Sequence, residues 1–594
     1  MTAVQPQPHI PLSSELVIPP GPYQYVPRMP VPDATPLAVC DEVVAELRAK
    51  ADAWVRTSPE RKRELLDEVL RATLPLIDRW TRLGSLHEGL DPTGPDAAEE
   101  TIVGPYIFLR GVRLHRDALD GIIRTGVPRI PGGVRTLPDG RVVARVMPTD
   151  LLDRLAYLRV HADVWMDRTV TADTLPATMA VAYRTPPNGR VCLVLGAGNA
   201  SSIGPLDAIH KLFVEQQVVV LKLHPVMAHL AEVQAAALAP LVREGVLRVI
   251  VGDHVQGAHL SAHPGVDTLH ITGADRTYDA IVYGPGPEGA ERRRRDEPVL
   301  HKPFSAELGN LTPIIVVPGR WSSAGLDYHA ENIATMLTNN AGFNCTTSRV
   351  IVTAAGWPQR EALLDRIRRR LGQLPTRLAY YPGAAARFAA FGEVHPEAEL
   401  FGDPSDGHLP WMLIPGLSPD AAGDPCYRVE AFCSVTAETP VDATDAVTFL
   451  ERATAFANER LWGTLNATII VDSRTAKDPA IRPALERAIG DLRYGTVSLN
   501  HWSAAGYGIG ITPWGAFPGN PRHDIGSGTG FVHNPLMFDA AEKTVIRGPF
   551  RAWPKPPWLS SHGGAHKLMP ELTRFEADHH PGRLAPILWY ALKG

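Results

Sequence analysis

A regular alternation of apolar strand-like runs and helical segments constrains this chain more than any other feature of its sequence. The strand-like runs are short and largely apolar, and the first of them has the composition of a strand buried in a parallel sheet. They are Val191–Leu195, Gln217–Leu223, Val246–Val251 and Thr268–Thr272. Helical segments such as Pro205–Glu215 separate them. The alternation predicts an α/β fold with helices on both faces of a parallel sheet.

A second α/β block follows from about residue 311 to 498, with strands predicted at Pro313–Val317, Arg349–Thr353 and Thr468–Val471. The 594 residues, 44% of them hydrophobic, are enough to bury a core without disulfides or a structural metal. The Pro-rich residues 1–36 are expected to wrap the surface in an extended form. Helical periodicity follows, and a hairpin is predicted at Gly132–Thr149 with Asp139-Gly140 as its turn.

Composition excludes several classes of protein. A net charge of −5 argues against nucleic acid as a partner, since such proteins carry a basic stripe. No stretch reaches 18 apolar residues and no secretory signal is visible, so the sequence predicts a cytoplasmic protein without a membrane span. The five cysteines include no C-x-x-C pair, so we expect neither disulfides nor a zinc site.

Two features of the first block have the chemistry of a nucleotide site. The turn containing Gly198 and Asn199 follows a strand and opens a helix, whose N-terminus favours an anion or a developing oxyanion. Lys222 ends a strand at the edge where open α/β sheets bind nucleotides. Each feature also has a purely structural explanation. The turn could be a plain strand-to-helix connection, and Lys222 could be a surface lysine whose stem packs on apolar groups.

Two further residues have the chemistry of catalysis. Cys345 lies in a small polar run, Asn339–Arg349, unlike the setting of a core cysteine, and nucleophilic cysteines occupy partly exposed surroundings. Glu307 precedes Leu308-Gly309 and a predicted strand, and an acid in this place could be a general base. The alternative for Glu307 is an acid that caps a helix or lies on the surface. A structural role is the alternative for the cysteine.

Taken in order, these motifs resemble the aldehyde dehydrogenase superfamily over residues 184–550. The matching positions are Gly198-Asn199, Lys222, His270–Gly273, Glu307–Pro313, Gly342–Cys345, Glu430–Phe432, Asn458–Ala467 and Asn500–Phe517. The chain departs from the family pattern at several of them. Gly198 stands where the family has tryptophan, Phe343 where it has glutamine, and Cys433-Ser434 where it has Gly-Pro. The chain therefore resembles a divergent member, and its substrate does not follow from the resemblance.

The resemblance implies an α/β fold with a Rossmann-type cofactor domain, an α/β catalytic domain and a small β oligomerisation element. The expected domains are an N-terminal extension over 1–110, a cofactor domain over 111–308 and a catalytic domain over 309–535. A C-terminal oligomerisation strand and extension take up 536–594, and the oligomerisation hairpin is expected at about 164–183. Homodimers or homotetramers are implied in the same way.

The activity implied is NAD(P)-dependent oxidation of an aldehyde to a carboxylic acid. By resemblance, Cys345 is the nucleophile that forms a thiohemiacetal and then a thioester. The amide of Asn199 and the backbone N–H of Cys345 stabilise the oxyanion. Glu307 activates the water that hydrolyses the thioester. Two alternatives remain open: an acyl-CoA-linked reductase or acylating dehydrogenase, and a non-catalytic scaffold of the same fold.

The cofactor implied is NAD or NADP. By resemblance, Lys222 holds the adenosine ribose, Glu430 the nicotinamide ribose, and Phe432 packs at the nicotinamide end, while Gly198 and Gly273 line the cofactor. Pro225 stands where NAD-preferring relatives have an acid, so neither dinucleotide is preferred.

The substrate and the metal content are the last expectations. Four aromatic residues fall on segments that line the substrate funnel in relatives, which hints at an apolar or aromatic aldehyde: Phe343, Trp502, Tyr507 and Trp514. No metal is expected, because His259 and His263 lie in a loop and lack a third ligand. The Arg292–Arg295 run is expected in a solvated surface loop.

Overall fold

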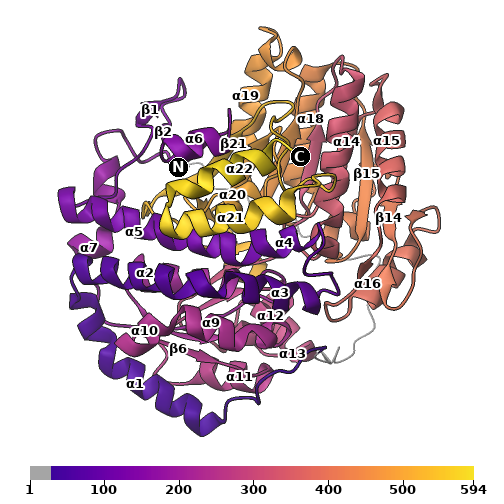
Figure 1. The fold of residues 1–594 in the computed structure, drawn as a ribbon. Helices are drawn as coiled ribbons and strands as arrows, with labels where there is room; N and C mark the ends of the chain where they lie inside the picture. Colours follow the sequence, from indigo (N-terminus) through magenta and orange to yellow (C-terminus); the bar gives the residue numbers. More distant parts are fainter. Residues whose placement is uncertain (1–27) are drawn as a thin grey trace.

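Two β-sheets form the centre of the protein, and helices cover both of them (Figure 1). The structure is a computed structural model that describes residues 28–594. Most of the Pro-rich segment predicted over 1–36 lies outside the described residues. Within residues 28–594, no helix has both the length and the apolarity needed to cross a membrane.

The six-stranded sheet has the order β19-β8-β7-β4-β5-β6. Its strands are β4 (Val191–Leu195), β5 (Val218–Lys222), β6 (Leu247–Ile250), β7 (Thr268–Thr272), β8 (Phe304–Glu307) and β19 (Gly528–Thr529). All pair in parallel except β19, which pairs antiparallel with β8. The four strands predicted in the first block are confirmed. After β4 the chain runs to β5 and β6 on one side and then to β7 and β8 on the other. The carboxyl ends of β4 and β7 thus form a topological switch point, where such sheets bind ligands.

Helices from the N-terminal part of the chain pack onto this sheet. α1 (Leu37–Arg56) contacts β4, β5 and β6, and α5 (Ile107–Thr125) contacts α8 (Ile203–Phe213). Figure 1 shows these indigo and purple helices beside the magenta strands and helices of the first block. The N-terminal helices therefore form part of the cofactor half, and α5 spans the boundary expected at residue 110.

The eleven-stranded sheet has the order β1-β2-β3-β21-β17-β16-β9-β10-β15-β14-β12. Its strands, in chain order, are β1 (Val134–Thr136), β2 (Val142–Met147), β3 (His161–Met166), β9 (Pro313–Val316), β10 (Val350–Ala354), β12 (Glu399–Phe401), β14 (Trp411–Ile414), β15 (Val435–Val441), β16 (Asn466–Ile470), β17 (Thr496–Leu499) and β21 (Ala541–Arg547). The predicted hairpin at 132–149 is confirmed by β1 and β2.

The C-terminal strand β21 joins the hairpin region to the catalytic sheet within one chain. It pairs in parallel with β17 and antiparallel with β3. The antiparallel pair made by β2 and β3 lies earlier than the range 164–183 predicted for an oligomerisation hairpin. Most of that range is instead irregular backbone, a 3-10 turn and the short helix α7 (Val181–Arg184), because paired strand ends at Met166.

The remaining helices follow. They are α2 (Pro59–Thr73), α3 (Ile77–His87), α4 (Ala97–Thr101), α6 (Leu151–Ala156), α9 (Ala231–Ala237), α10 (Ala239–Glu244), α11 (His254–Ala262), α12 (Asp275–Tyr283), α13 (Gly286–Arg294), α14 (Ser323–Thr338), α15 (Arg360–Gln373), α16 (Ala384–Val394), α17 (Pro425–Arg428), α18 (Ala446–Arg460), α19 (Arg482–Asp491), α20 (Ala505–Gly508), α21 (Ala565–Asp578) and α22 (Leu584–Ala591). Two small sheets pair β11 (Arg377–Leu378) with β13 (His408–Leu409) and β18 (Pro513–Trp514) with β20 (Val532–His533).

The Arg-rich run is helical, which corrects the prediction of a surface loop. It forms the end of α13, where Arg292 pairs with Glu288 and Arg295 pairs with Glu291. Acid and base at a spacing of four residues support a helix, and the composition alone did not reveal this.

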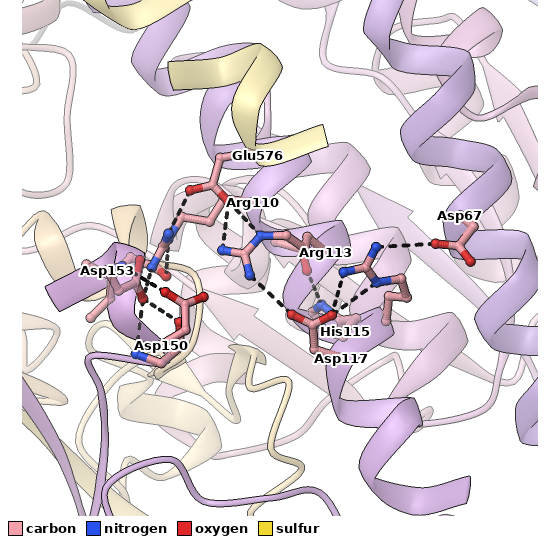
Figure 2. A network of polar contacts seen from close by, with 12 residues as sticks. Asp67, Arg110, Arg113, His115, Asp117, Asp150, Asp153 and Glu576 are labelled. Carbon is pink, nitrogen blue, oxygen red and sulfur yellow. Dashed lines mark hydrogen bonds and ion pairs between the residues drawn. The ribbon is translucent and has the colours of Figure 1, made fainter. Parts of the chain in front are cut away.

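A buried ion cluster connects four distant segments (Figure 2). On α5, the fully buried guanidinium of Arg110 donates to Glu576 Oε1 of α21 (2.7 Å) and to Asp153 Oδ2 of α6 (2.8 Å). Its Nε donates to the carbonyl of Ile509 at 2.8 Å. Arg113, also on α5, binds the other oxygen of Glu576 at 2.7 Å. These contacts hold the C-terminal helix α21 against the N-terminal half.

Replacing Glu576 by alanine is expected to lower the free energy of unfolding by about 3–5 kcal/mol, because two buried guanidinium groups lose their carboxylate. Urea unfolding followed by circular dichroism measures this change. The matched control on the same helix is Glu571→Ala. Glu571 pairs with Arg574 and Arg583 near the surface, so its loss is expected to cost less than about 1 kcal/mol. Equal losses in the two variants would contradict the assigned role of the cluster.

Candidate active site

The predicted catalytic residues meet where the two sheets adjoin. The turn after β4 carries Asn199, the end of β8 carries Glu307, and the loop before β10 carries Cys345. Asn340 of that loop donates from Nδ2 to the carbonyl of Asn199 at 2.7 Å, and the thiol of Cys345 interacts with the carboxyl of Glu307. Segments far apart in sequence therefore build one site.

The loop before Cys345 has a strained and tightly packed backbone. Asn340 and Ala341 both have φ of +51°, a conformation that costs free energy for residues other than glycine. Gly342 follows with φ of +80°, and a Cβ there would lie 2.5 Å from the carbonyl oxygen of Cys433. Only glycine fits this position, which explains the glycine of the Gly342-x-x-Cys345 motif.

Cys345 is the exception among the five cysteines, since it is half-buried and the other four are buried. Its carbonyl accepts hydrogen bonds from Thr312 Oγ1 (3.1 Å) and Asn466 Nδ2 (3.0 Å), which hold its backbone. Its side chain packs against an apolar cluster formed by Leu465, Trp514 and Val532. The thiol is therefore positioned rigidly, next to apolar surroundings.

The carboxyl of Glu307 has the environment of a proton-exchanging group. It is buried, and its Oε1 has no hydrogen-bond partner among residues 28–594. Burial raises the pKa of Glu307 to about 8, and the negative charge of Asp207 adds to the rise. The Cys345 thiol and the Trp514 indole interact with the carboxyl and oppose the shift. A carboxyl that titrates near neutral pH suits general acid–base work.

The same surroundings keep the cysteine in its neutral form at rest. Burial raises the pKa of the Cys345 thiol, and the negative charges of Glu307 and Glu430 raise it further. Since the thiolate is the nucleophile, a base must remove the thiol proton before attack. Glu307 is the carboxyl in contact with that thiol.

Asn199 offers a free donor to the site. Its carbonyl accepts from Asn340 and, at 3.5 Å, from the hydroxyl of Tyr380, so the backbone of the turn is held in place. Within the described part of the chain, its side-chain amide makes no hydrogen bond. A preorganised, unused amide is the kind of donor that stabilises an oxyanion.

Lys222 lies at the carboxyl end of β5, as predicted. It is buried, and among residues 28–594 its Nζ makes one long hydrogen bond of 3.4 Å, to the carbonyl of Leu223. Burial lowers the pKa of Lys222 to about 8. A buried ammonium with so little hydrogen bonding can readily accept an additional polar partner. Close by, Gly198 packs against the ring of His224, where a Cβ would lie 2.4 Å from Nδ1.

Glu430 and Phe432 lie on the other side of the site. A carboxylate oxygen of Glu430 accepts from the N–H of Asn310 at 3.2 Å, and burial raises its pKa to about 7 against the attraction of Arg349. The ring of Phe432 contacts Tyr381 with centroids 4.9 Å apart, and Tyr381 stacks on His224 at 5.9 Å. An aromatic row therefore connects the cofactor sheet to the segment after Glu430.

Gly273 lies beside the candidate base rather than beside Lys222. Its N–H donates to the carbonyl of Glu307 at 3.1 Å. The aromatic residues predicted for a substrate funnel separate into two groups. Tyr507 and Trp514 pack near Cys345, and Trp502 donates from Nε1 to the carbonyl of the neighbouring Thr346 at 2.8 Å. Phe343 packs instead against Tyr380.

Several supporting residues were missed by sequence reasoning. Asp207 on α8 is fully buried, accepts a hydrogen bond from Thr272 (2.9 Å) and contributes to the raised pKa of Glu307. Glu99 and Glu100 on α4 reach the site from the N-terminal part, where Glu99 accepts from the N–H of Asn340 (3.0 Å) and Glu100 from Ser201 (2.5 Å). The two adjacent acids open a helical segment, and no spacing links them to either loop.

Comparison with known proteins points to one family. A model of the aldehyde dehydrogenase family matches residues 144–377, which are about two fifths of the chain. An N-succinylglutamate 5-semialdehyde dehydrogenase of Sphingopyxis alaskensis is 28% identical over 192 residues, which are 32% of each chain. The chain thus matches about a third of the length of this relative.

Solved structures of aldehyde dehydrogenases share the fold of this chain at low identity. Aldehyde dehydrogenase C of Pseudomonas syringae, a cysteine-to-alanine mutant complexed with NAD+ and octanal, is 16% identical with a TM-score of 0.57. The match covers 86% of this chain and 89% of the other. An NADP-dependent glyceraldehyde-3-phosphate dehydrogenase of Bacillus halodurans, complexed with NADP, is 17% identical with a TM-score of 0.53, over 87% and 92% of the chains.

Replacing Glu307 by glutamine is expected to shift alkylation of Cys345 to lower pH. Removal of the neighbouring negative charge lowers the pKa of the thiol, so the reactive thiolate forms earlier as pH rises. Mass spectrometry of the Cys345 peptide after iodoacetamide treatment across a pH series measures the midpoint. The control is the exposed acid Glu361→Gln, for which no shift is expected. A midpoint that is the same in both variants would disprove the electrostatic coupling.

Proposed function

We propose that this protein catalyses the NAD(P)-dependent oxidation of an aldehyde to a carboxylic acid through a covalent intermediate on Cys345. The observation that supports it most directly is the pair formed by the half-buried Cys345 thiol and the buried Glu307 carboxyl, whose pKa is raised to about 8. Asn199, Lys222 and Glu430 surround this pair in roles that fit the same reaction.

The reaction begins with proton transfer from the Cys345 thiol to the Glu307 carboxylate. The thiolate then adds to the aldehyde carbon, and the carbonyl oxygen becomes an oxyanion that receives hydrogen bonds from the Asn199 amide and the Cys345 N–H. Each such donor contributes about 3–4 kcal/mol to transition-state stabilisation. A dinucleotide held at Lys222 and Glu430 would supply the hydride acceptor, and loss of hydride from the thiohemiacetal carbon leaves a thioester on Cys345.

Hydrolysis completes the cycle. Glu307 first releases the thiol proton to solvent and then removes a proton from water. The hydroxide adds to the thioester carbon, and the carbon–sulfur bond breaks to release the acid and the Cys345 thiolate. Glu307 beside the cysteine supports this hydrolytic route over an acyl-CoA-linked reductase, in which a base that activates water would destroy the thioester. It also argues against a non-catalytic scaffold, which has no use for a buried acid in contact with a thiol.

The residues present fit a dinucleotide. Lys222, a buried ammonium with a single long hydrogen bond, would hold the adenosine ribose, and Glu430 would hold the nicotinamide ribose. Gly198 and Gly273 would let backbone approach the dinucleotide, and Phe432 would pack at its nicotinamide end. Pro225 follows Lys222 at the place where an acid would repel a 2′-phosphate, so the proposal includes both NAD and NADP.

The surroundings of the thiol favour an apolar or aromatic aldehyde. Leu465, Trp514, Val532 and Tyr507 pack around Cys345 and present no charge to a substrate. The octanal complex of the Pseudomonas syringae relative is in line with this class of substrate. We further propose a homodimer or homotetramer assembled through the hairpin region and β21.

Replacing Cys345 by alanine is expected to lower kcat/KM at least about 10³-fold, because the covalent route is removed. A panel of aliphatic and aromatic aldehydes with NAD+ or NADP+, followed by absorbance of the reduced dinucleotide, measures it. The matched control is Cys40→Ala, a buried cysteine of α1 remote from the site. Unchanged turnover in the Cys345 variant would remove the mechanism, and turnover absent from both wild type and control would remove the activity.

Replacing Glu307 by glutamine is expected to separate the two half-reactions. Hydrolysis should fall about 10²–10⁴-fold, the range of general-base contributions, so steady-state turnover falls while an acyl group accumulates on Cys345. Intact-protein mass spectrometry after mixing with aldehyde and dinucleotide detects that group. In the wild type, the steady-state rate should rise with pH through about 8, since the base acts when deprotonated. A variant that turns over at the wild-type rate would exclude Glu307 as the base.

A further inference from the structure

Three side chains with metal-binding atoms converge near the segment that carries Glu430. His395 is the residue after α16, Asp424 caps the N-terminus of α17, and Cys426 lies in the first turn of α17. The Nε2 atom of His395 is 3.3 Å from Asp424 Oδ1 and 3.6 Å from Cys426 Sγ. All three ligand atoms lie within 4.8 Å of one another.

These separations match the edges of a tetrahedral zinc site. Zinc binds imidazole nitrogen and carboxylate oxygen at about 2.0–2.1 Å and thiolate sulfur at about 2.3 Å. A tetrahedron with those bond lengths places nitrogen and oxygen roughly 3.3 Å apart, and nitrogen and sulfur roughly 3.6 Å apart. The pairs measured from His395 have these distances before any ion is added.

A fourth residue orients the histidine as a metal ligand. The Nδ1 atom of His395 is 2.9 Å from Glu397 Oε1. When Nδ1 donates its proton to this carboxylate, the Nε2 lone pair points at Asp424 and Cys426. A carboxylate behind a metal-binding imidazole is the usual arrangement in zinc proteins, where it fixes the tautomer and the ring.

We propose that His395, Asp424 and Cys426 bind one Zn²⁺ ion, with water as the fourth ligand. Imidazole, thiolate and carboxylate together favour zinc over magnesium or calcium, which prefer oxygen ligands alone. The side chain of Asp424 is 11% exposed, so solvent reaches the edge of the cluster. Binding replaces the Cys426 thiol proton, so affinity falls as pH is lowered.

The zinc site would hold in place the segment that carries Glu430 and Phe432. α16 already binds that segment once, since Arg387 donates to the carbonyls of Ala431 (2.8 Å) and Phe432 (3.1 Å). The zinc would join the end of α16 to the start of α17 and form a second connection just before Glu430. Its role is structural, outside the catalytic pair.

A pair of histidines elsewhere in the chain has the sequence spacing of a metal site, but its geometry is less suitable than that of the His395 cluster. His259 and His263 contact Asp41 of α1 at 2.5 and 3.4 Å, and His259 lies on α11 rather than in the predicted loop. Their ring centroids are 6.0 Å apart, and Asp41 is half-exposed. In the proposed site, by contrast, His395 and Asp424 are 29 residues apart in the sequence, so no sequence motif reveals the site.

Cobalt titration of the whole chain tests the proposal. The protein is stripped with a chelator and titrated with Co²⁺, and the thiolate-to-cobalt charge-transfer band is recorded. One equivalent is expected to saturate the band, Zn²⁺ should abolish it, and elemental analysis after zinc loading should give one zinc per chain. Zinc should also raise the thermal midpoint of the stripped protein.

Cys426→Ser and His395→Gln are expected to lose the band, and Glu397→Gln should weaken zinc binding about 10–100-fold. The matched control is the buried thiol Cys433→Ser, which should keep the band. A band that persists in Cys426→Ser overturns the proposal. So does the absence of any thiolate–cobalt band in the stripped wild type, the result expected if a protonated His395 simply pairs with Glu397 and Asp424. The wild-type result decides even where a variant folds poorly.

Discussion

The buried guanidinium of Arg349 is the contact on which the two halves of the site depend. It donates to the carbonyls of Gly342 (2.6 Å) and Val435 (3.2 Å) and also to that of Cys433. It therefore fixes the loop of the nucleophile against the segment that follows Glu430. Together with Arg387 it opposes the raised pKa of Glu430. Because a buried charge is costly without hydrogen bonds, movement of any of these carbonyls away from Arg349 is disfavoured.

The buried acids around Cys345 also determine which protonation states the site adopts. Glu307, Glu430 and Asp207 crowd a space from which water is largely removed, so the pKa values of Glu307 and Cys345 both rise. At neutral pH the resting pair is mostly a neutral thiol and a neutral acid, which costs less free energy than a buried anion on either group. Charge forms only when the acid loses its proton, and the reactive state is therefore a minor one that substrate and dinucleotide must favour.

Sequence reasoning located the candidate catalytic residues because each stands in a local pattern. Asn199 follows a predicted strand, Lys222 ends one and Glu307 precedes one, and Gly342-x-x-Cys345 needs a glycine for a backbone reason. It failed where a contact joins distant segments. The 164–183 hairpin lies elsewhere because β3 pairs with β2 and β21, and α4 joins the site through Glu99 and Glu100, which no local pattern marks.

The same distinction explains why the termini were the least predictable parts. α21 is tied to the N-terminal half by Glu576, whose partners Arg110 and Arg113 stand more than 460 positions earlier, and by Arg574, which pairs with Asp78 of α3. A carboxylate on an amphipathic helix is ordinary in sequence, and its value arises only when burial removes the water that would otherwise pair with the arginines. The chain thus uses local patterns for chemistry and long-range ion pairs for assembly. A protein of this fold can therefore keep the local patterns of its site while the long-range ion pairs that assemble its termini change.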